Sequence, residues 1–205
     1  MTEQISDRTA LRDVVGEPMP LAATKEMDRL DKHCRHFISL SPFLCLSSMS
    51  ADGKADVTPR GDPPGFVKVL DDRTVLIPDR RGNRRIDTML NILEQPSVAA
   101  IFFLPGVEET LRLNGRASIV RDADLLADMA VQSKVPELAI RIEIDTVFFH
   151  CAKALKRSRL WDPETQIDRK DFPRYGQIVK DQRDPGGTAD EIEGVIQTNY
   201  RDEIY

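Results

Sequence analysis

The stretch 43-FLCLSSMSADGKADVTPR-60 decides the class of fold. It begins with a short, largely apolar segment, reaches Asp52-Gly53, and returns through a second short segment. An Asp-Gly pair between two strand-like segments favours a tight hairpin turn. Strands joined by such a turn run antiparallel, whereas parallel strands need a long crossover connection. The stretch therefore predicts a β-hairpin and, with it, an antiparallel sheet.

Further strand-like segments continue this pattern towards the carboxyl end. They occupy residues 66–70, 74–78, 97–104, 110–120 and 138–151. We expect about six strands from these segments, joined mostly as consecutive hairpins with one helix inserted after the fourth. This order favours a mainly β fold (β+α), a barrel or a sandwich with peripheral helices, over a doubly wound parallel sheet.

Helical periodicity flanks and interrupts these strands. The predicted helices cover residues 22–40, a segment from near Asn83 to before Pro96, 122–131, 153–162 and 188–205. In the last of these, Thr188 with Glu191 three residues later has the spacing of a capping box.

The composition describes a globular protein and not a disordered one. Of 205 residues, 40% are hydrophobic, and the formal net charge is −5. The acidic total excludes generic nucleic-acid binding. No apolar run is long enough to span a bilayer and no signal peptide is recognisable, and the three cysteines are too widely spaced for a disulfide framework. We expect a cytoplasmic protein with an arm and helix at 1–40, a central domain at 41–162 and an extension at 163–205.

Four arginines stand out in 80-RRGNRR-85, at the start of the helix predicted from near Asn83. A helix start carries partial positive charge, so cations there are unfavourable unless an anion is bound. Arg84 and Arg85 could bind a phosphate through forked hydrogen bonds, and Gly82 would allow close backbone approach. The alternative is a solvated helix start with Asp87 as ion-pair partner. The sequence has neither a Walker loop nor a GxGxxG pattern.

A second basic cluster lies in 153-KALKRSRLW-161. Helical spacing places Lys153, Lys156 and Arg157 on one face. Ser158 and Trp161, the only tryptophan, accompany them. The alternative interpretation is a solvated helix face.

Two more arginines are candidates for the same chemistry. Arg112 lies mid-strand with Thr110 on the same face, and Arg60 lies in a turn at 58-TPRGDPPG-65. Each of these arginines could equally be exposed to solvent.

Taken in order, these four segments resemble the pyridoxamine 5′-phosphate oxidase-like family of FMN-binding split β-barrels, over roughly residues 40–162. The most specific piece is GNRRIDTMLNILEQPSVAAIFF, and the strand TLRLNGRA and the segment KALKRSRLWD follow it. The nearest subgroup is a bacterial one of uncertain activity. The resemblance implies a six-stranded antiparallel split β-barrel, an FMN cofactor and a homodimer with flavin at the subunit interface.

The resemblance also implies roles for particular residues. Arg84 and Arg85 would bind the FMN phosphate beside Asn83, with Arg60 near the ring or the phosphate. Thr110 and Arg112 would come from the partner strand. The remaining implied cofactor-binding residues are Ile77 and Pro78 along the flavin, and Lys153, Arg157, Ser158 and Trp161 from the other subunit or the barrel rim.

One departure from the family concerns the substrate. The family's vitamin-B6 oxidases have a further Arg-x-His-type segment near the C-terminus, and Arg174 in 172-FPRYGQIVKDQ-182 does not reproduce it. We therefore expect an oxidoreductase acting on an unidentified small donor. The alternatives are a non-catalytic flavin- or phosphometabolite-binding module and a deazaflavin- or haem-using variant.

Other chemistries have weaker support in the sequence. A metal site could draw on His33, Cys34, His36, His150 and Cys151, although their spacing fits no standard zinc pattern, and we expect none. No Ser-His-Asp arrangement favours a hydrolase, and neither nucleic acid nor a membrane is an expected partner.

Overall fold

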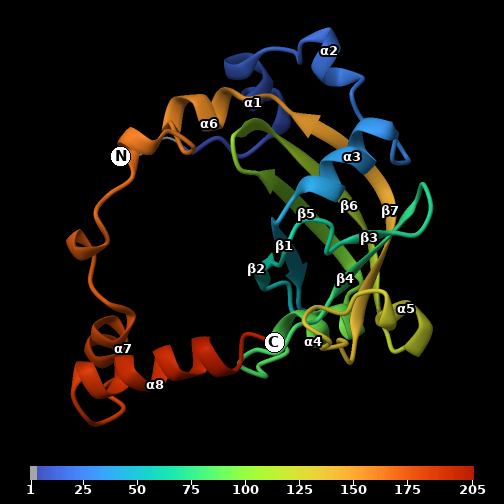
Figure 1. Ribbon diagram of the computed structural model, residues 1–205. Coiled ribbons are helices and arrows are strands. Elements are labelled where there is room, and N and C mark those ends of the chain that lie inside the picture. Colours follow the sequence, from blue (N-terminus) through green and yellow to red (C-terminus); the bar gives the residue numbers. More distant parts are fainter. Residues whose placement is uncertain (1–3) are drawn as a thin grey trace.

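The computed structural model describes residues 4–205. Its centre is one strongly curved antiparallel sheet with the strand order β2-β1-β5-β6-β7-β4-β3 (Figure 1). The strands are β1 (Phe43–Met49), β2 (Ala55–Gly61), β3 (Lys68–Val69), β4 (Thr74–Pro78), β5 (Ser97–Leu104), β6 (Val107–Val120) and β7 (Ala139–His150). The expected fold class, mainly β with peripheral helices, is confirmed, with seven strands where six were expected.

Tight turns produce the hairpins on which this sheet depends. Gly53 has φ 85°, and its N–H donates to Ser50 O at 2.9 Å, so the predicted Asp-Gly turn joins β1 to β2. Pro105 and Gly106 join β5 to β6, with Leu104 paired to Val107. Because this second turn is only two residues long, β6 begins at residue 107 and not at 110.

Eight α-helices surround the sheet within the described part of the chain. They are α1 (Arg8–Val15), α2 (Pro20–Ala23), α3 (Lys32–Leu40), α4 (Asp87–Glu94), α5 (Ala123–Ala127), α6 (Lys153–Ser158), α7 (Tyr175–Arg183) and α8 (Ala189–Asp202). The capping box predicted for the last helix is present, with both the Thr188 and the Glu191 hydrogen bonds. Helices α1 and α7 were not predicted. Within residues 4–205, no helix has the length and the apolar character that a membrane crossing would need.

The main core lies between the inner face of the sheet and α3. Leu44, Leu46, Phe102, Leu111 and Leu113 from the strands are wholly buried. Burying a side chain of this kind contributes about 1.5–3 kcal/mol. Helix α3 adds Cys34, Phe37 and Ile38 to the same cluster.

The helix predicted over residues 22–40 is wrong in its first half. Only α3 and the short α2 are helical, and Met27 instead pairs with Val147 of β7 through two backbone hydrogen bonds of 3.0 and 2.8 Å. Strand β4 pairs with residues 139–143 of β7, so the edge of β7 at Val147 is open to Met27. A sheet edge of this kind offers unpaired N–H and C=O groups, which here outweigh the helical periodicity.

Candidate functional site

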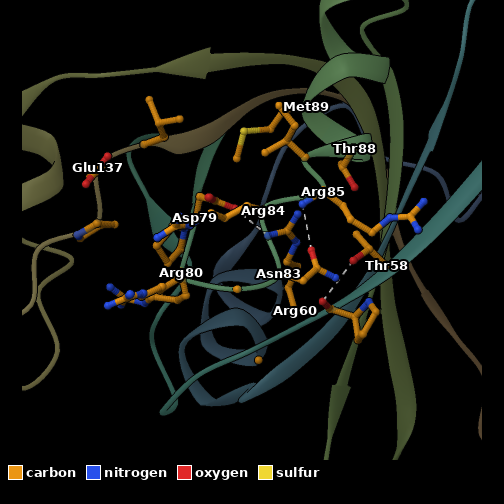
Figure 2. Close-up of a pocket in the computed structure, with 18 of the residues that line it drawn as sticks. Thr58, Arg60, Asp79, Arg80, Asn83, Arg84, Arg85, Thr88, Met89 and Glu137 are labelled. Carbon is orange, nitrogen blue, oxygen red and sulfur yellow. Dashed lines mark hydrogen bonds and ion pairs between the residues drawn. The ribbon is translucent and has the colours of Figure 1, made fainter. Parts of the chain in front are cut away.

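A pocket of about 910 Å³ lies between β2, residues 79–86, the first turn of α4 and the loop before β7. Small-molecule sites typically have volumes of about 300–1,000 Å³. Figure 2 shows Arg60, Asn83, Arg84 and Arg85 grouped in this pocket beside Thr88 and Met89 of α4. The structure thus brings the arginine-rich segment together with Arg60, which lies on β2 and not in the turn that the sequence suggested.

The arginine-rich segment precedes the helix and does not form its first turn. Helix α4 begins at Asp87, not near Asn83, because Arg84 (φ 59°) and Ile86 (φ 55°) both have left-handed backbone conformations. Left-handed residues cannot continue a right-handed helix, and for a β-branched residue such as Ile86 this conformation is rare. The side chain of Asn83 supports the loop by accepting a hydrogen bond from Arg85 N at 3.0 Å.

Six cations and four carboxylates line this pocket. The cations are Arg60, Arg80, Arg81, Arg84, Arg85 and Lys134, and the carboxylates are Asp56, Asp79, Asp87 and Glu137. Arg85 Nε donates to Asp87 Oδ2 at 2.7 Å, which is the ion pair of the alternative interpretation, and the hydrogen bond and charge of Asp87 raise the pKa of Arg85. Both side chains are largely exposed, and exposed pairs contribute only about 0–1 kcal/mol. An incoming anion can therefore displace Asp87 at little cost.

Arg60 carries the most informative unsatisfied group in the pocket. Its Nη1 donates to Asp79 Oδ1 at 2.9 Å, and its side chain is only 20% exposed. Its Nε is buried and has no hydrogen-bond partner among the described residues. Buried donors are almost always paired in native proteins. Because Arg60 lines the pocket, a ligand whose binding shifts this side chain is a candidate source of the missing acceptor.

Arg84 and Lys134 are also available to a ligand. Within residues 4–205 neither makes an ion pair, whereas Arg60, Arg80, Arg81 and Arg85 each pair with a carboxylate. Close approach of a ligand to the backbone of Gly82, which the sequence suggested, stays a prediction. The φ of Gly82 is not left-handed, and a Cβ there would come no closer than 3.9 Å to Arg80 O, so the loop does not require glycine at this position.

Arg80 has a structural role that sequence reasoning missed. Its guanidinium pairs with Asp62, which is almost wholly buried, and donates to Met129 O at 2.8 Å. Tyr205 hydroxyl donates to the same Asp62 at 2.7 Å, and Glu203 lies 3.6 Å from Arg81. The C-terminal residues therefore form one wall of the pocket. Because these contacts hold the Arg80 guanidinium within the fold, the ligand-binding role is left to the arginines later in the chain.

The other predicted site residues lie elsewhere in the same chain. Ile77 is buried in the core, while its neighbour Pro78 lines the pocket. Thr110 pairs with His150 near the far end of β7, and Arg112 pairs with Phe148. Ile77 pairs with Ile140, which lies ten residues before His150 along β7. Ten residues correspond to roughly 33 Å of strand.

Helix α6 packs against β6 and belongs to that distant group. Trp161 Nε1 donates to Val107 O at 2.9 Å, and Lys156 pairs with Glu108 at 3.1 Å. Lys153, Arg157 and Ser158 lie on the same short helix. One chain therefore gathers Arg60, Pro78, Asn83, Arg84 and Arg85 in the pocket, and separates them from Thr110, Arg112, Lys153, Arg157, Ser158 and Trp161.

The histidines and cysteines form no metal centre within residues 4–205, where no group of three potential ligands is close enough to hold an ion. Cys34 lies in the main core, and its burial raises the pKa of the thiol to about 12. A thiol of this kind stays protonated, whereas metal ligation needs the thiolate.

The fold and the pocket define a class: small mainly β proteins with an arginine-lined pocket on an antiparallel sheet. A sequence model described as pyridoxamine 5′-phosphate oxidase matches residues 30–151, more than half of the chain. The chain belongs to this family, as its resemblance indicated. No curated protein matches it significantly.

Three solved structures are among those similar to this chain. A putative pyridoxamine 5′-phosphate oxidase from Lactobacillus delbrueckii is 19% identical, with a TM-score of 0.48 over 61% of this chain and 99% of its own. An FMN-binding protein from Syntrophomonas wolfei is 12% identical, with a TM-score of 0.44 over 57% and 88%. HutZ, a haem storage protein from Vibrio cholerae, is 17% identical, with a TM-score of 0.41 over 58% and 94%.

Proposed function

We propose that the chain is an FMN-binding flavoprotein and an oxidoreductase acting on a small donor, with the FMN phosphate in the pocket between β2 and α4. The observation that carries the proposal is that Arg60, with a buried Nε that has no hydrogen-bond partner among the described residues, and Arg84, which makes no ion pair there, both line the pocket. Family membership and the volume of the pocket support the same assignment. When bound, FMN would supply the hydride and electron transfer, since that chemistry belongs to the cofactor.

The residues of the chain would then bind and orient the phosphate end. Arg84 would donate charge-assisted hydrogen bonds, Arg60 Nε would gain its missing acceptor, and Arg85 would exchange Asp87 for the phosphate. The first turn of α4 lies in the pocket wall, and the first N–H groups of an α-helix have no intrahelical partner. Together these donors favour a dianion over a neutral group.

The proposed assembly is a homodimer with flavin at the subunit interface. In support, one chain leaves Thr110, Arg112 and the α6 residues far along β7 from the pocket. A second copy would bring this group to the first copy's pocket, and the side chains of Arg157 and Trp161 would then close the site from the partner.

One observation favours the alternative, a non-catalytic flavin- or phosphometabolite-binding module. Among the described residues, the pocket wall contains no histidine or cysteine. Proton transfer during turnover would then depend on the carboxylates, lysine and tyrosine of the wall, on the flavin or on solvent. A wall made only to bind is sufficient for a carrier or a sensor.

The test is a fluorescence titration with FMN and with riboflavin, which lacks the phosphate. Wild type should bind FMN more tightly, and Arg84→Ala should weaken FMN binding about ten- to hundredfold while leaving riboflavin binding unchanged. Arg157→Ala should also weaken FMN binding if the partner contributes. Arg121→Ala, an exposed arginine outside the pocket, is the matched control.

Equal affinity for FMN and riboflavin in the wild type would contradict the phosphate assignment. An absorbance spectrum of the untreated protein identifies a flavin, a deazaflavin or a haem. Bleaching by a nicotinamide donor with recovery in air supports the oxidoreductase, whereas a stable yellow colour supports the binding module.

A further inference from the structure

A second cluster of cations lies on the face of β6 and β7 opposite the main core. Arg112 is opposite Phe148, and Thr110 is opposite His150. Leu111 and Leu113, the two neighbours of Arg112 in the chain, belong to the core. Alternation along a strand therefore places Arg112, Phe148 and His150 on one face. The pocket beside α4 contains none of these residues.

Lys25 reaches this face from the segment before α3. The backbone pairing of Met27 with Val147 fixes that segment along β7. Lys25 Nζ lies 4.4 Å from the centre of the Phe148 ring, and Arg112 Cζ lies 5.5 Å from the same centre. The distance between the two charged groups therefore cannot exceed the sum of these two distances. His150 completes the cluster, with its ring centroid 5.0 Å from that of Phe148.

No carboxylate neutralises this cluster within residues 4–205. Neither Lys25 nor Arg112 lies within 4.0 Å of an acidic group there, and their polar contacts are with neutral acceptors. Lys25 Nζ donates to Phe149 O at 3.4 Å, and Arg112 Nε donates to Asn114 Oδ1 at 3.1 Å. The other N–H groups of the guanidinium remain free to bind a ligand.

The surroundings strengthen the interaction of these charges with an anion. Phe148 is only 5% exposed beneath the two cations, so both contact an apolar surface, Lys25 being partly buried and Arg112 exposed on its outer side. Cations over an aromatic face are held in place by the ring, which reduces the freedom lost when a ligand binds. Partial burial, and then the positive charges of Lys25 and Arg112, lower the pKa of His150. A bound anion would offset the repulsion that these two cations exert on the protonated form of His150.

We propose that Lys25, Arg112 and His150 form an anion-binding site that takes the carboxylate or phosphate group of a small molecule. Arg112 supplies a forked donor, Lys25 a point charge, and His150 a ring N–H. The cluster lies within one chain, but the proposed dimer would bring Arg112 to the partner's flavin pocket. In that dimer the site would hold the anionic end of a donor beside the flavin, a placement that rests on the proposed function.

The test follows the three histidine side chains of the full-length protein by NMR as pH is varied. Sulfate, a dianion that does not titrate near neutral pH, stands for a phosphate group, and acetate stands for a carboxylate. Each is added at constant ionic strength. A bound anion should raise the pKa of His150 saturably by about one unit, which equals about tenfold tighter binding to the protonated form. His33 and His36, which lie on α3, are internal references and should not move.

Matched variants make the result specific. Lys25→Gln and Arg112→Gln should each abolish the saturable shift, Arg112→Lys should retain most of it, and Arg116→Gln on the same strand should leave it unchanged. The anion that gives the larger shift identifies the class of ligand. A wild-type His150 that responds to neither anion would overturn the proposal, and so would a response in Lys25→Gln and Arg112→Gln as large as in the wild type. The NMR titration of His150 does not depend on flavin. A failure of the anion-site proposal is therefore distinguishable from a failure of the FMN titration.

Discussion

Gly115 lies at a critical contact between the two longest strands. The pairing of β6 with β7 shifts register between Asn114 and Gly115. A Cβ built on Gly115 would lie 2.1 Å from Glu143 O and 2.9 Å from a methyl group of Ile142. Because the backbone carbonyl cannot move without breaking the ladder, only glycine fits this β-bulge.

We therefore expect Gly115→Ala to lower the free energy of unfolding by about 1–3 kcal/mol, the usual cost of overpacking. Chemical denaturation measured by circular dichroism would show it. Gly194→Ala is the control: a Cβ at Gly194 meets nothing within 4 Å, and alanine is the better helix former in α8, so that variant should lose no stability. An equal loss in both variants would mean that the register shift is not the cause.

Among the elements, α3 shows how one capping residue positions a helix in the core. Asp31 accepts hydrogen bonds from the N–H groups of Cys34 at 2.8 Å and His33 at 2.9 Å, and these bonds lower the pKa of Asp31. Because the native pKa is depressed below 3.8, this contribution to stability is present above that pH and lost as the pH falls through the native pKa. The cap also ends the preceding extended segment, which allows Met27 to pair with β7.

Asp31→Ala should cost about 0.5–2 kcal/mol of stability at neutral pH. The difference from wild type should shrink in acid, because protonated Asp31 no longer contributes its full effect. Urea denaturation at neutral pH, and again below the ordinary pKa of aspartate, measures both quantities. Asp7→Ala removes the same kind of cap from α1, a helix with no buried residue, and should leave global unfolding within about 0.5 kcal/mol of wild type. A difference that persists undiminished in acid would argue against the cap.

The elements also show what local sequence determines. The β1–β2 hairpin and α8 were predicted correctly, because an Asp-Gly turn and a capping box act within a few residues. The start of α4 was misplaced because the periodicity continues through Ile86, whereas the chain there adopts left-handed conformations that periodicity does not report. The helix before α3 failed for a tertiary reason, the open edge of β7. Helix α7 could not be anticipated, since its packing depends on the close approach of Gly176 to α8.

For the whole molecule, the candidate site combines local and distant contributions. Arg60, Asn83, Arg84 and Arg85 were identified as site residues from the sequence and share one pocket. Asp79 and the first turn of α4, which adjoin the arginines in the chain, could have been added from the same stretch. Tyr205 could not, since 143 residues separate it from Asp62 and no pattern links them. The separation of the β6 and α6 residues from the pocket is likewise a property of strand register over the whole sheet.

The docked C-terminus is the tertiary contact that holds the α7–α8 arm to the sheet beside the pocket. Figure 1 shows the arm standing away from the sheet and returning at its C-terminal end near α4. The two helices pack mainly on each other. Tyr205 hydroxyl donates to Asp62 at 2.7 Å, and the ring lies 6.0 Å from the Arg80 guanidinium. The hydrogen bond to Asp62, together with burial, raises the pKa of Tyr205, so the contact persists at neutral pH and is lost only as the pH rises through that value.

Tyr205→Phe removes this hydrogen bond and leaves the Asp62–Arg80 pair intact. A hydrogen bond to a charged acceptor contributes about 1.5–3 kcal/mol, so the tail should undock about ten- to hundredfold more often while global stability changes little. Cleavage by trypsin after Arg201, in the last turn of α8, requires such local opening and should accelerate accordingly. Tyr200→Phe is the matched control, because Tyr200 is exposed and its hydroxyl donates no hydrogen bond within the described residues. Cleavage after Arg183, at the far end of the arm, should be unaffected in both variants. If Tyr205→Phe and Tyr200→Phe were cleaved after Arg201 at the same rate, the anchor would have to be assigned to Glu203 and Arg81 instead.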